Sequence, residues 1–599
     1  MITGVLATSS QGRASSPPRG GTYRVGWEFS FEGDGFDPTG EDQLGTPGIY
    51  DNLLLRTLVG TDHVPGAAGE QLVPDLATSI PSPTNGGRTY TFAIRKGVRF
   101  GPPVGRQVTS ADVRYAIERL ARPRNRSWYW VYFDVIAGLN AYRAGHAHSI
   151  SGISTPNPRT ISFTLTRPDA AFPAMLSMPA SAPIPREVAR CFEGKPGKYG
   201  SDLVSSGPYM IEGADRVKFS SCATLEPMAG ISATQLDLVR NPDYDPKTDS
   251  RAARENLPDR FVFVAYRNLG LAHNQQRIVS QLQAGDLDDA YFQSTPKAVV
   301  AAAAAAARQG RLRLDPASWS VSAVFNLTQP PFDDVHVRRA FAWLLDRQAL
   351  RDTMGGPLAG PIATHIIPAY LLGGRLQGYN PFATPGERGS VAKARAEMAL
   401  SKYATRNGVC VATACRKVPL NQLSNSPFYA AGLRMVPLIE AMAAKIGIHF
   451  KATGKDEATL TTPSKINGLG LVPNYDWPDD YPDPASLVDR VFSGSQINAF
   501  NFDVSLLGIT SGQAKRLGVT GAVKAVPSLD RAIARCAATA GAARHACYAN
   551  LDRTLTSRVV PWVPLLLRNR VTILGPRVAK WEYDQADATT AYAHVAVQP

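Results

Sequence analysis

Hydrophobic and polar residues follow two periods along this chain, and the two periods alternate from residue 22 to the C-terminal region. Alternation with a period of two predicts strands, which we place at residues 22–25, 89–94, 160–165, 235–240, 260–266, 446–451, 562–568 and 570–574. Apolar residues at helical spacing predict helices at 49–59, 111–120 with Ser110 as N-cap, 299–307, 334–350, 392–402, 435–445 and 528–555. Alternating strands and helices predict an α/β chain whose helices pack on sheets.

Length and composition limit the classes of protein that fit. The chain has 599 residues, is 44% hydrophobic and contains no run of 18 apolar residues, so we expect no membrane-spanning helix. The formal net charge is +14, but there is no Lys/Arg block and no zinc or helix-turn-helix motif, so we expect no nucleic-acid partner. An abundance of Arg, Ala, Gly and Pro is typical of a high-GC genome, and the positive charge suits a mild attraction to an anionic envelope surface.

The cysteines indicate the compartment. Six cysteines allow 15 pairings, and their clustering favours Cys191–Cys222, Cys410–Cys415 and Cys536–Cys547. Paired cysteines indicate an oxidising compartment, whereas six buried thiols would suit the cytosol. There is no CxxC spacing and the nine histidines are scattered, so we expect neither a metal site nor a cofactor.

The first 21 residues read as a flexible leader. Only Val5, Leu6 and Ala7 form an apolar run there, and no lipobox cysteine is present. A secretory signal needs a longer apolar region, so either the leader was removed or misassigned, or the protein stays inside the cell. The cysteine pattern favours the first alternative and an extracytoplasmic, envelope-associated or secreted location.

A series of short phrases follows in a fixed order along the chain. They are VPDLATS (73–79), TYTF (89–92), RKGVRF (95–100), TSADV (109–113), SGPY (206–209), VRNPDY (239–244), QAGDLD (283–288), FNLTQPPF (325–332), VRRAF (337–341), LDR (345–347), KIGI (445–448), WPDDYPDP (477–484) and PWVP (561–564). In this order the phrases resemble the family 5 extracellular solute-binding proteins, the oligopeptide-, dipeptide- and nickel-binding group of ABC importers. The segment 214–234 looks like an insertion relative to typical members.

The resemblance implies a two-lobed, periplasmic-binding-protein-like fold of the class with an extra subdomain. The first lobe would comprise residues 22–318 and 560–599, including an inserted subdomain at about 60–170, and the second lobe residues 319–559. Two strands would act as hinges, and the lobes would close over a ligand like a flytrap. The implied partners are a peptide or amino-acid-like ligand and ABC permease subunits in the membrane, and the chain is expected to be a monomer.

The strongest candidate binding segment is residues 474–489. It carries Asp476, Asp479, Asp480, Asp483 and Asp489, together with Tyr475, Trp477 and Tyr481. Clustered carboxylates repel one another, and the ammonium or guanidinium group of a ligand would relieve that repulsion. By resemblance, Asp480 pairs with the free amine of a peptide beside Trp477, with Asp479 as its rival for this role. The alternative is a solvated Pro-rich loop whose aspartates shape turns.

Other candidate residues lie in the first lobe. Residues 127–133 concentrate aromatic side chains, of which Tyr129 or Trp130 would face the cleft while the others pack in the core. Glu41 and Asp42 are weaker candidates for ligand contact. Some oligopeptide binders carry an arginine three residues before the tryptophan to hold a ligand carboxylate, but this chain has Asn474 there.

The function predicted is capture of peptides, or of peptide-like or basic ligands such as arginine-containing peptides, for ABC uptake, without enzymatic activity. The alternative is the same fold binding a peptide signal or an antibiotic-pathway metabolite, as relatives in antibiotic clusters, the clavulanic acid cluster included, would do. A nickel, haem or sugar specialist is a further option. Ser294 and Lys297 fit the S-x-x-K motif of serine acyl-enzymes, but S-D-N and K-T-G are absent and Pro296 interrupts the motif.

Overall fold

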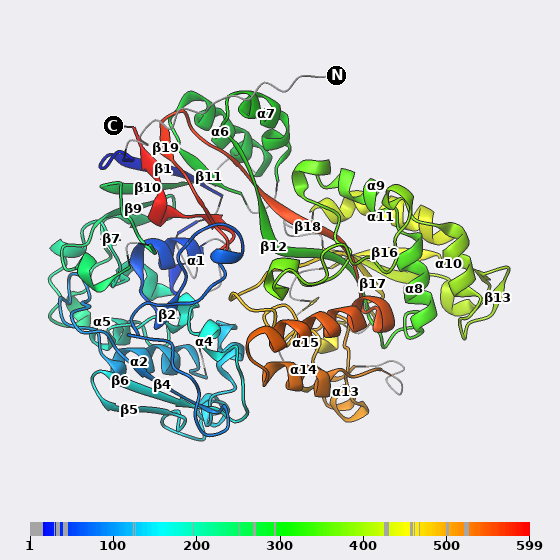
Figure 1. The fold of residues 1–599 in the computed structure, drawn as a ribbon, viewed down its shortest axis with the longest axis horizontal. Coiled ribbons are helices and arrows are strands. Elements are labelled where there is room, and N and C mark those ends of the chain that lie inside the picture. The colour runs from blue at the N-terminus through cyan, green and yellow to red at the C-terminus, as the bar shows by residue number, and fades with distance from the viewer. Residues whose placement is uncertain are drawn as a thin grey trace, which may run out of the picture.

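The computed structural model describes residues 16–598, apart from 29, 32–35, 40–45, 124, 126, 196, 251, 267–270, 293–294, 424–429, 456–458, 461, 467, 499–501 and 520–525. The chain forms two lobes, each built on its own mixed sheet (Figure 1). We call the part that carries the six-stranded sheet the first lobe, and the part that carries the five-stranded sheet the second lobe. The predicted α/β class is confirmed.

The six-stranded sheet of the first lobe has the order β11-β1-β10-β9-β7, with β8 paired to β9. Its strands are β1 (Thr22–Trp27), β7 (Tyr209–Ile211), β8 (Ile231–Ser232), β9 (Gln235–Arg240), β10 (Arg260–Ala265) and β11 (Asp289–Tyr291). Helix α6 (Leu271–Ala284) packs so closely on β1 that a Cβ at Gly26 would lie 2.9 Å from Ile278. Helix α7 (Lys297–Arg308) packs beside α6.

The first lobe also contains a three-stranded sheet, in the order β4-β6-β5, at the opposite end from β1 (Figure 1). It consists of β4 (Thr89–Ala93), β5 (Ile153–Asn157) and β6 (Thr160–Thr164), and α2 (Ser110–Leu120) packs against β5 and β6. The N-cap of α2 is Thr109 and not Ser110 as predicted, because Thr109 and Asp112 form a reciprocal capping box. Helix α2 therefore begins at Ser110, one residue earlier than predicted.

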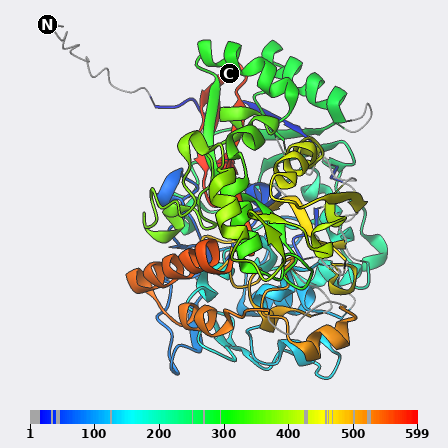
Figure 2. The ribbon, with the colours of Figure 1, turned by 90° about the vertical axis from the view of Figure 1, so that its right-hand side faces the viewer.

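The sheet of the second lobe has the order β16-β15-β17-β12-β18. Its strands are β12 (Leu312–Phe325), β15 (Val418–Leu423), β16 (Phe450–Lys455), β17 (Leu471–Trp477) and β18 (Trp562–Ile573). Helix α11 (Ala430–Ala444) packs on β15 and β17, and α8 (Val335–Leu344) packs on α10 (Val391–Met398). Figure 2 shows these helices above α13 (Ser511–Leu517), α14 (Asp530–Ala537) and α15 (Gly541–Thr554), which are orange.

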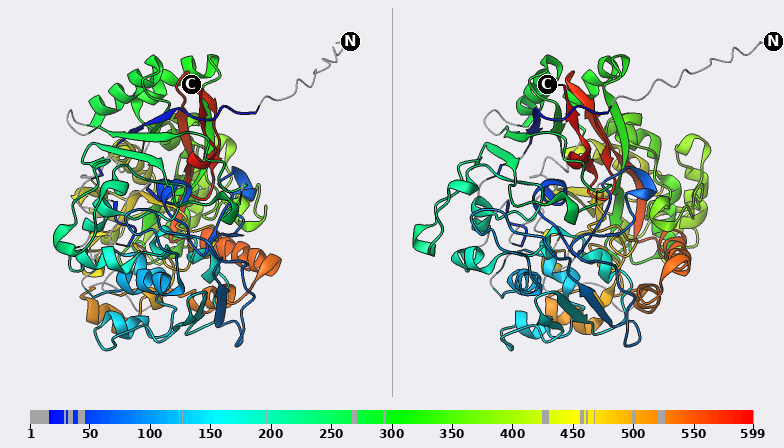
Figure 3. Two further views of the ribbon diagram at one scale, coloured as in Figure 1. Left: turned by 90° about the vertical axis from the view of Figure 1, so that its left-hand side faces the viewer. Right: turned by 60° about the vertical axis from the view of Figure 1, so that its left-hand side comes forward.

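Strands β12 and β18 run antiparallel to each other over their whole length and link the two lobes (Figure 1). Their pairing is interrupted between Pro316 and Ser320, where the register shifts. After β18 the chain returns to the first lobe, and its C-terminal strands lie beside β1 (Figure 3). The predicted lobe boundaries near residues 318 and 560 remain predictions, although β12 and β18 are the strands on which they fall.

The shorter elements complete the fold. They are α1 (Thr46–Ile49), α3 (Leu139–Arg143), α4 (Phe172–Met175), α5 (Arg186–Ala189), α9 (Arg347–Thr353), α12 (Pro463–Ile466), β2 (Val59–Gly60), β3 (Val73–Pro74), β13 (Thr405–Arg406), β14 (Val409–Cys410), β19 (Val578–Lys580), β20 (Tyr583–Asp584), β21 (Thr589–Thr590) and β22 (Ala596–Val597). A π-helical turn, Tyr50–Leu54, follows α1 directly.

Several predicted elements are wrong in extent. The single helix predicted at 334–350 is α8 and α9, because the Asp346 side chain caps a new helix by accepting a hydrogen bond from the Ala349 amide. The helix predicted at 528–555 is likewise α14 and α15. The helix predicted at 49–59 ends by Leu54, the strand predicted at 446–451 is β16 (Phe450–Lys455), and the two strands predicted at 562–574 are the continuous β18.

The three predicted disulfides are confirmed. Cys191–Cys222, Cys410–Cys415 and Cys536–Cys547 are bonded, with Cα–Cα distances of 5.2, 6.4 and 5.4 Å. The first ties the segment 214–234 to α5 and its following turn, and the third joins α14 to α15. None of the helices in the described part of the chain combines the length and apolar character that crossing a membrane requires.

Candidate ligand-binding site

A cavity lies between the two lobes. The first lobe lines it with Asp51, His63, Tyr129 and the turn at 177–180, and the second lobe with the segment 478–482. The C-terminal turn 586–588 and Trp319 of β12 also line it. Both lobes and the linking strand β12 therefore contribute to one site.

We call residues 476–489, which carry the five aspartates, the acidic segment. Strand β17 positions the start of this segment, and the seven residues of the strand are all buried. The Trp477 ring packs 4.7 Å from Phe502 and 6.4 Å from Trp128 of the first lobe, and its indole N–H donates to the Ser486 carbonyl at 3.4 Å. Tyr475 stacks on Trp477. These two predicted binding residues are absent from the lining of the cavity, which among the described residues takes Asp479, Asp480 and Tyr481 from this segment.

Asp480 lies where the strand has ended and the chain turns into the cavity. Its backbone N–H donates to the Ser486 hydroxyl at 2.6 Å, which fixes the turn. Its carboxylate accepts a hydrogen bond from the Tyr132 hydroxyl of the first lobe. Asp480 thus faces the opposite lobe, as a residue that binds a ligand held between the lobes must.

Three other aspartates of the segment have partners within the second lobe. Asp476 pairs with Arg568 at 2.6 Å, and Asp483 pairs with Arg544 at 2.6 Å. Asp489 accepts a hydrogen bond from the Tyr548 hydroxyl at 2.9 Å. Arginines of the same lobe therefore balance two of the five carboxylates of the segment.

The lobes contact each other around the cavity as they would in a closed form. Arg490 of the second lobe forms a bidentate pair with Asp134 of the first, at 2.8 and 3.1 Å. The Ala170 amide donates to the Ala537 carbonyl at 2.9 Å, again between lobes. Tyr132 meets Tyr481 edge to face with their ring centroids 5.4 Å apart.

The aromatic segment divides as predicted between cavity and packing. Tyr129 lines the cavity. Trp130 instead lies under the Arg143 guanidinium at 4.0 Å, and Trp128 stacks on Tyr129 with centroids 4.2 Å apart. Glu41, Asp42 and Ser294 of the sequence predictions lie outside the described residues.

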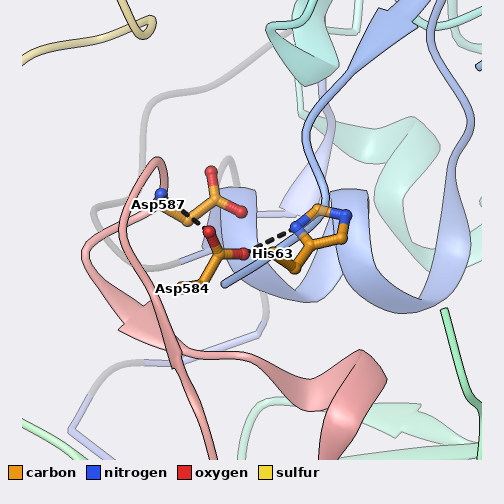
Figure 4. A group of neighbouring side chains, drawn as sticks. All are labelled: His63, Asp584 and Asp587. Carbon is orange, nitrogen blue, oxygen red and sulfur yellow. Dashed lines mark hydrogen bonds and ion pairs between the residues drawn. The ribbon is translucent and has the colours of Figure 1, made fainter. Parts of the chain in front are cut away.

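A second group of acidic residues, which the sequence analysis missed, lies on the first-lobe side of the cavity. We call it the first-lobe acidic group: Asp51, His63, Glu70, Asp584 and Asp587. His63 Nδ1 bonds to Asp584 Oδ2 at 2.7 Å, and Asp587 lies beside them (Figure 4). The π-helical turn after α1 carries Asp51, and the turn between β20 and β21 carries Asp587.

Burial and mutual repulsion shift the pKa values of this group. Burial, and then Asp584 and Asp51, raise the pKa of Asp587 well above its usual value. Burial also raises the pKa of Asp51 well above its usual value, in spite of Arg254. For Asp584 burial is outweighed by His63 and Asn52, which hold its pKa below the usual value.

Burial and repulsion between carboxylates also raise the pKa values of Glu70 in the first lobe and Asp479 in the second. Burial, and then Asp584, raise the pKa of Glu70 to about 8. Burial, followed by Glu70 and Asp480, raises the pKa of Asp479 well above its usual value. Carboxylates of both lobes therefore repel one another in a poorly solvated space.

Comparison with known proteins identifies the family. The model of the bacterial extracellular solute-binding proteins, family 5 (middle region), matches residues 71–499. The chain belongs to this family. The oligopeptide-binding protein OppA of Bacillus subtilis is 25% identical over 309 residues, which are 51% of this chain and 50% of OppA.

Solved structures agree with the fold over nearly the whole chain. Clavulanic acid biosynthesis oligopeptide binding protein 2 superposes with a TM-score of 0.77 at 25% identity, covering 98% of this chain and 96% of that one. The periplasmic binding protein DppA from Helicobacter pylori, in complex with the peptide STSA, superposes with a TM-score of 0.68 at 17% identity, covering 97% and 99%. The two-lobed fold is thus confirmed, while the match to OppA spans about half of that protein's length.

Proposed function

We propose that this family 5 chain captures a peptide or peptide-like ligand outside the cytoplasm and delivers it to the membrane subunits of an ABC importer. The observation that carries the proposal is the cavity between the lobes, into which Asp480 and Tyr481 of one lobe and Tyr129 of the other project. A peptide ammonium group would bind Asp480 and displace the Tyr132 hydroxyl, with aromatic walls beside it.

Closure follows from the division of the site between the lobes. A ligand held by Asp480 and by first-lobe groups makes all its contacts only when the lobes are together, so binding shifts the population toward the closed form. The Arg490–Asp134 pair adds a contact that exists only in that form. Importer subunits would recognise the closed form of a monomeric binding protein.

Extracytoplasmic location and the absence of catalysis belong to the same proposal. Three disulfides suit an oxidising compartment. The family is one of solute-binding proteins, and Pro296 is the N-cap of α7, so Lys297 of the S-x-x-K phrase begins a helix that Ser294 precedes. A serine acyl-enzyme needs that serine at a helix start with the lysine one turn later, and we assign no such role.

The test is a thermal-shift screen of the full chain with free amino acids, tripeptides, nickel and simple sugars. A ligand that binds only the folded state raises the melting temperature by mass action. We expect tripeptides to raise it and nickel and sugars to leave it unchanged. A rise with nickel or a sugar, and none with peptides, would contradict the proposal.

A second candidate function is supported by one comparison. The structure that superposes with a TM-score of 0.77 is named as an oligopeptide binding protein of clavulanic acid biosynthesis. The same cavity in this chain would then bind a pathway metabolite or peptide signal. Binding of such metabolites more tightly than of any tripeptide in the same screen would favour this function.

A further inference from the structure

Carboxyl groups line the cavity on two facing sides. Asp479 and Asp480 lie on the second-lobe side, and Asp51 and Asp587 on the other. The proposed function uses Asp480 for a ligand ammonium group. The pair Asp51 and Asp587 lies outside that contact and has no role in it.

The cationic side chains near this pair are already engaged. Arg254 lines the cavity, but its guanidinium pairs with Asp249 at 3.0 Å and with Asp75 at 3.1 Å, and it donates to the Asp51 carbonyl at 2.8 Å. His63 Nδ1 bonds to Asp584 Oδ2 at 2.7 Å, and in the tautomer whose Nδ1 carries the proton, Nε2 is an acceptor. Within the part of the chain that the structure describes, no lysine or arginine forms an ion pair with the carboxylate of Asp51 or Asp587.

Unsatisfied polar atoms point to the same place. His63 is 2% exposed and lines the cavity, and its Nε2 has no hydrogen-bond partner among the described residues. Both carboxylate oxygens of Glu70 are buried and also lack a partner there. Because a buried polar atom without a partner is costly, the Nε2 of His63, which lines the cavity, indicates that a ligand supplies the missing contact.

A metal ion is the less suitable occupant. Three potential ligand atoms of His63, Asp584 and Asp587 lie within 4.8 Å of one another. However, the Asn52 amide nitrogen already lies among them, 2.9 Å from Asp584 Oδ2, 3.3 Å from His63 Nδ1 and 3.5 Å from Asp587 Oδ2. The Asn52 oxygen accepts from the Ala593 amide at 3.0 Å, so the amide cannot turn its oxygen to a metal without losing that bond.

We propose that the cavity recognises a ligand with two positive charges, an amino acid or short peptide that carries a basic side chain beside its α-ammonium group. Resting on the proposed function, this assigns the ammonium group to Asp480 and the side-chain cation to the space between Asp51, Asp587 and Asp479. The side-chain cation supplies the charge that the first-lobe acidic group lacks. Because it lies between carboxylates of both lobes, it also favours closure.

The test compares three tripeptides by calorimetric titration of the full chain: Arg-Ala-Ala, citrulline-Ala-Ala and Ala-Ala-Ala. Citrulline has nearly the shape of arginine without its charge, so it isolates the contribution of the cation. We expect Arg-Ala-Ala to bind at least about tenfold more tightly than the citrulline peptide, as loss of a charge-assisted partner requires. Zinc and nickel salts alone are titrated in parallel.

Substitutions of Asp587 and Asp51 test whether the side-chain cation binds beside these two residues. Asp587→Asn is expected to reduce the ratio of the arginine and citrulline affinities to about threefold or less, with a ligand-free melting temperature equal to or above that of the parent, because a repelling buried charge is removed. Asp51→Asn should act in the same way, and provides the test if Asp587→Asn does not fold. The matched control is Asp215→Asn, which removes an exposed carboxylate far from the cavity and should keep the full ratio.

Different results would contradict the inference, the proposed function or the position assigned to the side-chain cation. Equal binding of the arginine and citrulline peptides overturns the inference and leaves the proposed function intact. No binding of any tripeptide at millimolar concentration overturns both. A full ratio in Asp587→Asn and in Asp51→Asn, or tight zinc or nickel binding that either substitution abolishes, overturns the assignment of the side-chain cation to this space.

Discussion

The acidic segment 476–489 and the first-lobe acidic group face the same cavity but are neutralised in different ways. In the acidic segment, Arg568 and Arg544 of the same lobe balance two of the carboxylates at 2.6 Å each. In the first-lobe acidic group, His63 and Asn52 form hydrogen bonds with Asp584, while burial and repulsion raise the pKa values of Asp51 and Asp587. Charges that a fold balances internally hold the fold together, and charges that it leaves unbalanced beside a cavity select a ligand.

The comparison also shows why density of charge along the sequence is a poor guide to a binding site. Five aspartates within fourteen residues attract attention, yet only Asp479 and Asp480 among them line the cavity. The first-lobe acidic group has no such density, because its members come from both ends of the chain. Local charge is informative only after the partners of each carboxylate are known.

The largest expected effect on stability comes from removing an arginine that forms an ion pair with the acidic segment. Arg544→Met leaves Asp483 without its buried partner and removes the donors to the carbonyls of Cys536 and Ala537. We expect the free energy of unfolding to fall by about 3–5 kcal/mol, as in other buried pairs that lose one member. Melting of the ligand-free chain measures it, and the double variant with Asp483→Asn should recover part of the loss. An unchanged melting temperature would show that the pair contributes little.

The next effect concerns the single aspartate of the segment that faces the other lobe. Asp480→Asn is expected to weaken binding of Ala-Ala-Ala by about tenfold or more, because the ammonium group loses a charge-assisted bond. Tyr132→Phe, which keeps the carboxylate and removes only the hydroxyl that bonds to it, is the matched control and should retain most of the affinity. If Asp480→Asn binds normally and Asp479→Asn does not, the role belongs to Asp479.

A third prediction concerns the pH dependence that buried carboxyls of both regions share. A carboxyl whose folded pKa lies above its unfolded value stabilises the fold at low pH, and this contribution is lost as the pH rises through the folded pKa. Glu70 at about 8 and Asp489 at about 7 place that loss between pH 5 and 8. We expect the melting temperature of the ligand-free chain to fall by roughly 2–5 °C over this range. A melting temperature that rises over the range would contradict the pKa directions.

The smallest effect should have the opposite sign to that of Arg544→Met. Glu70→Gln removes a buried carboxyl that the fold must hold largely protonated at pH 7.5 and whose oxygens have no partner among the described residues, so it should raise the free energy of unfolding at that pH by about 1 kcal/mol. It should also reduce the decrease in melting temperature between pH 5 and 8. Glu226→Gln, at an exposed position, is the control and should change neither quantity. Destabilisation by Glu70→Gln would mean that the carboxylate has a structural role.

Much of the fold was predictable from the sequence where local signals were strong. The alternating segments at residues 89–94 and 235–240 are strands β4 and β9, because alternating apolar residues bury one face of a sheet. Helix breaks were harder to place, as at Leu345 and Asp346, where apolar periodicity continues through a cap. Among the candidate site residues, Asp479, Asp480, Tyr481 and Tyr129 line the cavity, whereas Trp477, Tyr475 and Trp130 pack around it.

The sequence by itself determined the family, the α/β class and the three disulfide pairs, because each depends on short motifs or on neighbours along the chain. Only the tertiary structure decided which carboxylates are balanced and which are left facing the cavity. Residues 51, 63 and 70 meet residues 584 and 587 because the chain after β18 returns to the first lobe, where the Ala593 amide binds the Asn52 side chain. Electrostatic interaction depends on distance in space and on exclusion of water, and a single sequence records neither.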